Sequence, residues 1–214
     1  MELNLTSGKD PFVILLLSDT HVNGPKDSIP DRYEEGIRRC EPDLILHCGD
    51  ICTEEVIGQL RGIAPVYAVR GNRDLLTLFR LPAEIDLDIS GFRIHMEHGQ
   101  GNFFRYLRSK TYITFCRVFG INPDYRKVVR IRDDFGKYDL YCFGHSHVGS
   151  MEQREGTLLI NPGHMDVTWR GGSLPAPSFC VIQMYRDRIV VRKTIFAGQT
   201  ISTETTMFPR KHTG

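Results

Sequence analysis

Residues 12–21 have the sequence FVILLLSDTH, in which six apolar residues run directly into a polar cluster that contains Asp19 and His21. A run this short cannot span a membrane, and its unbroken apolar character is typical of a strand that is buried on both faces. Apolar runs over residues 44–47 and 66–69 have the same character. Because helical stretches separate the three runs, the pattern predicts a parallel sheet joined by crossover helices. These helices are expected over residues 31–40 and 53–60.

From residue 85 onward the pattern is that of antiparallel hairpins. Ser90 and Gly91 form a tight turn between apolar strands over residues 85–89 and 92–97. Further strands are expected over residues 138–143, 151–155, 157–160, 179–185 and 189–196. The polar tail after Gly198 is expected to be loose. The sequence therefore predicts an α/β protein with two packed sheets and helices outside them.

A segment over residues 101–134 interrupts this rhythm, because aromatic residues recur in it at roughly helical spacing. Residues 103–132 contain eight Lys or Arg and one acidic residue, Asp124, whereas the whole chain has a net charge of +1. This asymmetry predicts a basic helical insertion that meets an anionic partner. The insertion could cover a functional site, or it could be an oligomer contact or a packed helical pair.

The composition is that of an ordinary globular protein, with 214 residues, 41% of them hydrophobic and 25% charged. Such a chain is long enough for a single domain over residues 1–214. The six cysteines form no Cys-x-x-Cys pair, which indicates reduced thiols and a cytoplasmic location. No signal peptide or membrane span is expected, and the near-neutral charge does not indicate a nucleic-acid partner. A homo-oligomer remains open.

Five polar clusters each follow an apolar run. They are Asp19-Thr20-His21, Gly49-Asp50, Gly71-Asn72-Arg73-Asp74, His98-Gly99 and Gly144-His145-Ser146-His147. Loops at the carboxyl ends of strands converge on one crevice in open α/β sheets. A lone Asp after a strand is usually a turn former, but carboxylates, imidazoles and an amide oxygen together suit manganese, iron, zinc or nickel. Two such ions can activate a bridging water and stabilise a phosphate, with Asp50 as the natural bridging carboxylate.

The order of these clusters resembles the calcineurin-like metallophosphoesterase superfamily over residues 12 to about 165, especially its small bacterial and archaeal phosphodiesterases. The resemblance implies a four-layer αββα sandwich of two mixed sheets flanked by helices. It also implies two divalent ions, manganese foremost, with iron, zinc, nickel or cobalt as alternatives. The implied ligands are Asp19, His21, Asp50 and His147 for the first ion, and Asp50, Asn72, His98 and His145 for the second. Asp74 is expected to support the ligands, and the Asn161-Pro162-Gly163 turn to pack near the site.

The expected activity is that of a phosphoesterase, in which a hydroxide bridging two metal ions attacks a phosphodiester or an activated phosphate ester. The expected catalytic residues are Asp50, Asn72, Arg73, Asp74 and His98. Many phosphatases that this chain resembles have a histidine at the position of Arg73, and that histidine protonates the leaving group. An arginine stays charged at ordinary pH and cannot replace it. A diester is therefore expected over an alkyl monoester, with Arg73 either clamping the phosphate or pairing with Asp74.

Two alternatives remain open. UDP-2,3-diacylglucosamine hydrolases, which cleave a lipid pyrophosphate, share the Gly-Asn-Arg-Asp sequence and an aromatic, basic insertion. Here 44 residues separate Gly99 from Gly144, which is long for the small phosphodiesterases. A retromer subunit has a similar fold but serves as a non-catalytic protein-binding scaffold. Among the other histidines, His47 and His95 are expected to be core or face residues, whereas His164 could approach the substrate.

Overall fold

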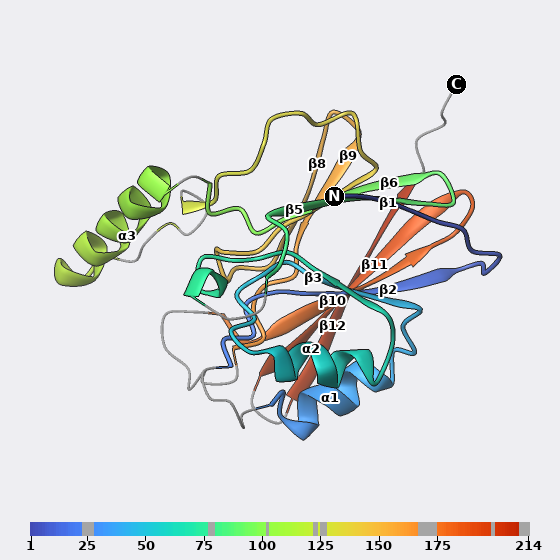
Figure 1. Ribbon diagram of the computed structural model, residues 1–214, viewed down its shortest axis with the longest axis horizontal. Helices are drawn as coiled ribbons and strands as arrows, with labels where there is room; N and C mark the ends of the chain where they lie inside the picture. The colour runs from blue at the N-terminus through green and yellow to red at the C-terminus, as the bar shows by residue number, and fades with distance from the viewer. Residues whose placement is uncertain are drawn as a thin grey trace.

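The computed structural model describes residues 1–22, 28–76, 80–101, 103–121, 124, 128–166, 175–197 and 200–209. Two six-stranded sheets pack against each other (Figure 1). Sheet A has the strand order β1-β5-β6-β7-β9-β8, and sheet B has the order β12-β11-β10-β2-β3-β4. Both sheets contain parallel and antiparallel pairs. The predicted α/β class with two mixed sheets is confirmed.

Most strands agree with the sequence pattern, but the strand over residues 2–5 was not expected. Sheet A consists of β1 (Glu2–Leu5), β5 (Glu84–Ile89), β6 (Phe92–Glu97), β7 (Leu140–Cys142), β8 (Ser150–Arg154) and β9 (Thr157–Asn161). Sheet B consists of β2 (Phe12–Leu17), β3 (Leu44–His47), β4 (Val66–Ala68), β10 (Ser178–Met184), β11 (Arg188–Ala197) and β12 (Thr200–Pro209). As predicted, β2, β3 and β4 run parallel to one another.

The apolar run of β2 is buried on both faces, which explains why it lacks polar alternation. Ile14 and Leu16 face the core between the two sheets. Leu15 and Leu17 face the opposite way, toward α1 (Asp31–Arg38) and α2 (Glu54–Arg61). The two helices therefore form one outer layer over sheet B (Figure 1).

The outer face of sheet A has a different cover. Phe135 and its neighbours in the irregular segment 128–138 pack on Tyr141, Phe143 and Leu159. Within the described part of the chain, this outer layer is thus formed by irregular structure.

The insertion contains one long helix, α3 (Phe103–Val118), which projects from the side of the sandwich (Figure 1). Of the helical insertion expected over residues 101–134, Phe103–Val118 is helical, whereas residues 129–134 are irregular. No helix among the described residues is long and apolar enough to cross a membrane.

The expectation of a loose tail after Gly198 was wrong. Residues 200–209 form β12, which pairs with all ten residues of β11. Its polarity was misleading because Thr200, Thr203, Thr205 and Thr206 are β-branched, and such residues favour strands even when they are polar.

Candidate metal centre

The five polar clusters meet at one end of the sandwich. Each of them follows a strand, and backbone hydrogen bonds join neighbouring loops: Asp19 donates to the Gly49 carbonyl at 2.9 Å, and Gly144 donates to the His98 carbonyl at 3.1 Å. The predicted ligands from sheet B loops are Asp19, His21, Asp50 and Asn72, and those from sheet A loops are His98, His145 and His147. The site therefore lies where both sheets end.

The backbone at this site is strained. Nine non-glycine residues in the described chain have a positive φ, and five of them are predicted ligands. They are Asp19, His21, Asp50, His145 and His147, with φ between 50° and 69°. A left-handed conformation costs a residue with a side chain about 1–2 kcal/mol. Because the strain is concentrated at the predicted ligands, we infer that the loop conformations direct these side chains into the site.

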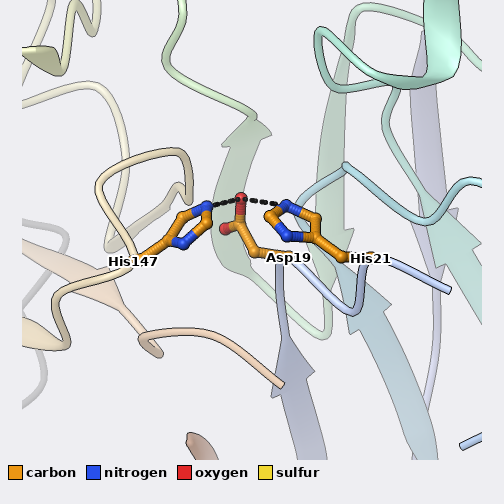
Figure 2. Close-up of side chains that lie close together, drawn as sticks. All are labelled: Asp19, His21 and His147. Atoms are coloured by element: carbon orange, nitrogen blue, oxygen red, sulfur yellow. Dashed lines mark ion pairs between the residues drawn. The ribbon is translucent and has the colours of Figure 1, made fainter. Parts of the chain in front are cut away.

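One group of side chains consists of Asp19, His21 and His147 (Figure 2). Asp19 Oδ1 lies 3.2 Å from His147 Nε2 and 3.6 Å from His21 Nε2. Figure 2 shows the carboxylate between the two imidazoles, which come from different loops. Asp19 Oδ1 is buried and has no hydrogen-bond partner.

A second group consists of Asp19, Asp50 and His98. His98 Nε2 lies 3.6 Å from Asp50 Oδ1 and 3.3 Å from Asn72 Oδ1. His145 Nδ1 lies 3.3 Å from the same nitrogen. The structure thus brings together all seven predicted ligands.

Asp50 lies between the two groups. Its Oδ2 is 3.3 Å from His21 Nε2 in the first group, whereas its Oδ1 faces His98 in the second. One carboxylate oxygen is therefore directed to each group.

Two imidazoles are oriented by partners that the sequence reasoning missed. His98 Nδ1 is 2.6 Å from the Cys48 carbonyl oxygen, which can only accept, so Nδ1 carries the proton and Nε2 faces the site. His21 Nδ1 is 3.1 Å from Asp166 Oδ2. A carboxylate on the far nitrogen is a common support for a metal-binding histidine. The only sequence signal for Asp166 is its place shortly after the Asn161-Pro162-Gly163 turn.

Asp74 joins the loop after β3 to the loop after β4 through hydrogen bonds to their backbones. Its carboxylate accepts backbone N–H bonds from Asp50, Ile51, Cys52 and Gly71 at 2.8–2.9 Å. Since Asp74 is buried, these bonds fix the backbone that carries Asp50. This geometry is that of a positioning residue.

Close packing around the ligands requires glycine at two positions. A Cβ at Gly71 would collide with Asp50 Oδ1, and a Cβ at Gly144 would collide with the Ser18 hydroxyl. The predicted packing of the Asn161 turn near the site is also present, because Asn161 Nδ2 donates to the Gly144 carbonyl at 2.8 Å and to Ser146 Oγ at 3.0 Å.

The pKa values of the buried carboxyl and imidazole groups depend on one another. Burial alone would raise the pKa of Asp19, but His147 and His98 lower it well below its usual value. Burial would lower the pKa of His21, but Asp166, Asp19 and Asp50 raise it to about 11. His145 has no such excess of carboxylates, and burial next to His98 lowers its pKa to about 3.

The residues fit a divalent cation. Two ionised carboxylates are buried among imidazole nitrogens, and Asp19 Oδ1 lacks a hydrogen-bond donor. A buried charge of this kind is costly unless it is paired or coordinates a metal. Nitrogen and oxygen ligands at one site suit transition-metal ions and zinc.

A cavity of about 210 Å³ opens above these groups. Five predicted site residues besides Arg73 line it on one side: His21, Asp50, Asn72, His145 and His147. Helix α3 lines the other side with Tyr106, Ser109, Lys110, Ile113 and Thr114. The Tyr106 ring lies 6.2 Å from the His145 ring. The basic insertion is therefore placed over the candidate metal centre.

The remaining histidines have structural contacts. His47 and His95 are fully buried, as expected of core or face residues. His164 Nε2 lies 2.9 Å from the Pro175 carbonyl oxygen, and its ring centroid lies 5.4 Å from that of His147, with the rings tilted by 37°. His164 is buried and does not line the cavity, so the structure gives no support to the expectation that it approaches the substrate.

A family model for the calcineurin-like phosphoesterase superfamily domain matches residues 12–187, which include every predicted ligand. The chain belongs to this superfamily. A probable metallophosphoesterase of Methanothermobacter thermautotrophicus is 28% identical over 178 residues, which cover 83% of this chain and 89% of that protein. A probable metallophosphoesterase of Methanocaldococcus jannaschii is 30% identical over 152 residues, which cover 71% of this chain and 67% of that protein.

Solved structures share the calcineurin-like fold. Vps29 of Cryptosporidium parvum superimposes with a TM-score of 0.70 and 18% identity, over 94% of this chain and 100% of that chain. At this identity the likeness concerns the fold alone. The predicted family membership and fold are confirmed.

Proposed function

We propose that this member of the calcineurin-like superfamily hydrolyses a phosphodiester or an activated phosphate ester with the help of two divalent ions. The position of Asp50 carries the proposal, because its two oxygens face His21 and His98, one from each group of ligands. A carboxylate in this position can bridge two ions. Such a pair of ions lowers the pKa of water and stabilises the charge that develops on the phosphate oxygens.

The proposed roles follow the two groups. Asp19, His21 and His147 hold one ion, and Asn72, His98 and His145 hold the other, with Asp50 shared. Arg73 orients the phosphate from the edge of the cavity, where its exposed side chain is part of the lining. Asp74 positions Asp50 through the backbone.

The preference for a diester or an activated ester rests on Arg73. An arginine does not release a proton near neutral pH, so a poor leaving group such as an alkoxide would receive no proton from this position.

We include in the proposal manganese as the preferred ion, a single domain over residues 1–214 and a cytoplasmic location.

The direct test is a matrix of metal ions against substrates. Manganese, iron, zinc, nickel and cobalt are each combined with an aryl phosphodiester, an alkyl monoester, a cyclic nucleotide and a nucleotide pyrophosphate. We expect the aryl diester with manganese to give the highest turnover. Faster turnover of the alkyl monoester would overturn the substrate preference.

Substitution of the central ligands tests the metal pair. We expect Asp50→Asn and His98→Ala each to lower turnover about a hundredfold or more, because activation of water and charge stabilisation both depend on the ions. Metal content by elemental analysis should fall in parallel. Asp187→Asn is the matched control, since Asp187 is exposed in the β10–β11 turn and pairs with Arg188. Retained activity and metal content in Asp50→Asn would refute the site.

A second candidate is hydrolysis of a lipid pyrophosphate. It is favoured by a groove of about 470 Å³ that shares Ser146 with the metal cavity. The groove is lined by apolar side chains that include Val129, Phe143 and Met151, beside the charged Glu152 and Arg154, and the apolar part offers a surface for an acyl chain. A diacylated nucleotide-sugar pyrophosphate added to the matrix would favour this candidate if it were cleaved faster than every aryl diester. A chain that binds no metal after manganese incubation would instead support a scaffold function.

A further inference from the structure

The largest concentration of exposed apolar side chains lies on and just after α3. Ten large hydrophobic residues are exposed in the described chain, and six of them fall between residues 104 and 121. They are Phe104, Leu107, Phe115, Val118, Phe119 and Ile121, each 50–79% exposed. Exposed apolar residues are ordinary when scattered, but a contiguous group marks an interaction surface.

The helical members of this group share one face. Phe104, Leu107, Phe115 and Val118 recur at intervals of three, eight and three residues, which places them along one stripe of the helix. We call this stripe the outer face of α3. It is distinct from the face that lines the metal cavity, where Tyr106, Lys110 and Ile113 lie.

The charge of the segment is of one sign. Residues 103–121 contain four basic residues and no acidic residue. Arg108 is exposed and adjoins the outer face. Long basic side chains next to an apolar stripe can keep their charged ends in the headgroup region while the stripe enters the lipid boundary.

We propose that the outer face of α3 docks on an anionic lipid surface. The helix projects from the sandwich (Figure 1), and each of the four residues of the stripe is at least 50% exposed, so a bilayer can reach them. The phenyl rings supply buried apolar area, and the basic residues supply attraction to negatively charged headgroups.

Charge complementarity favours lipid over a second copy of the chain. A symmetric dimer through this face would place two segments of the same strong positive charge against each other, because an isologous contact uses the same surface twice. An anionic bilayer has the opposite charge over its whole surface. The outer face also contains no cavity-lining residue, so its docking is independent of the proposed hydrolysis.

The test is co-sedimentation of the full chain with vesicles. One set of vesicles contains phosphatidylcholine alone, and the other contains phosphatidylcholine with phosphatidylglycerol. We expect binding to the anionic set only, weakened by high salt. F104S/F115S should lower the partition constant about tenfold or more, because two phenyl rings no longer enter the lipid boundary. Arg108→Glu, which replaces an exposed positive charge with a negative one, should lower the partition constant several-fold.

Matched controls keep the result interpretable. I201S/M207S removes two apolar side chains of similar exposure, 56% and 62%, from β12, and should bind vesicles like the wild type. The melting temperature of each variant shows that the fold is intact. Turnover of a soluble aryl diester is measured in parallel, so that loss of hydrolysis with retained vesicle binding would contradict only the proposed function.

Three results would overturn the docking proposal. They are absence of binding by the wild type, an equal loss in the α3 and β12 double variants, and a dimer in sedimentation velocity that F104S/F115S dissociates while vesicles remain unbound. The last result would assign the outer face to a second copy of the chain.

Discussion

A backbone hydrogen bond holds Arg73 next to Asp50, at the centre of the site. The Arg73 N–H donates to Asp50 Oδ1 at 2.8 Å, so any movement of Arg73 is coupled to the carboxylate that faces both ligand groups. The side chain lines the cavity, while the neighbouring Asp74 accepts backbone donors from two loops. The phosphate clamp is therefore the role that we propose for Arg73 and test against a salt bridge to Asp74.

Arg73→Ala should lower kcat/KM for an aryl diester about tenfold to a hundredfold, because a charge-assisted hydrogen bond to the phosphate is lost. Metal content should not change. Arg73→Lys should recover only part of the loss, since an ammonium lacks the planar fork of donors. Arg73→His should raise alkyl monoesterase activity by supplying a proton donor that titrates near neutral pH.

The control for this series is Arg70→Ala, which removes an exposed arginine from the same loop outside the cavity lining. Steady-state kinetics and elemental analysis give kcat/KM and the metal content of each variant. Unchanged kcat/KM in Arg73→Ala would exclude Arg73 from the mechanism.

The ligands could be predicted individually, but their supports could not. Asp19 and His147 are recognisable because each follows an apolar run and belongs to an ordered set. Asp166 has no such signal. Its contact with His21 arises only when the loop after β9 folds back across 145 residues of chain, and no local sequence pattern encodes such a return.

At the scale of elements, strands buried on two faces were the most predictable, because their sequence leaves no alternative. β2 and β3 have the predicted bounds. β12 was missed because its polarity was taken as a sign of disorder, whereas pairing with β11 satisfies its backbone. The cover of sheet A by residues 128–138 was not foreseen either, because a helical insertion was expected up to residue 134, whereas the apolar contacts of this segment form without a helix.

Helix α3 was predicted, and its place over the cavity leads to a prediction about substrate size. Tyr106→Ala and Lys110→Ala should each raise the KM for a large nucleotide or lipid pyrophosphate about fivefold to tenfold, because a ring or a cation next to the substrate is lost. The KM for a small aryl diester should change less than about twofold, since a small ester bound at the ions need not reach α3.

Thr111→Ala is the matched control, because Thr111 is exposed on the same helix and does not line the cavity. Michaelis constants for both substrates, measured at saturating metal, distinguish the two readings of the insertion. A similar change for the large and the small substrate would contradict a cover and leave α3 with its outer face as its only role.

At the scale of the whole molecule, the candidate metal centre joins the two sheets. Asp19 and Asp50 belong to loops of sheet B, whereas His98 and His147 belong to loops of sheet A. Their side chains meet across the end of the sandwich at 3.2–3.9 Å. Because ions bound here would contact both sheets at once, metal binding and the stability of the whole fold should be coupled.

Adding manganese to the metal-free chain should therefore raise its melting temperature. A ligand at one hundred times its dissociation constant stabilises the folded state by about 2.7 kcal/mol. For a chain of this length, each kcal/mol corresponds to about 2–4 °C, so the expected shift is about 5–10 °C. Asp50→Asn should lose most of the shift, because one shared carboxylate serves both groups, whereas Asp187→Asn should keep it. Differential scanning calorimetry with and without a chelator measures the effect directly. An equal shift in Asp50→Asn and the wild type would mean that manganese binds elsewhere, and the proposed link between the two sheets would then be wrong.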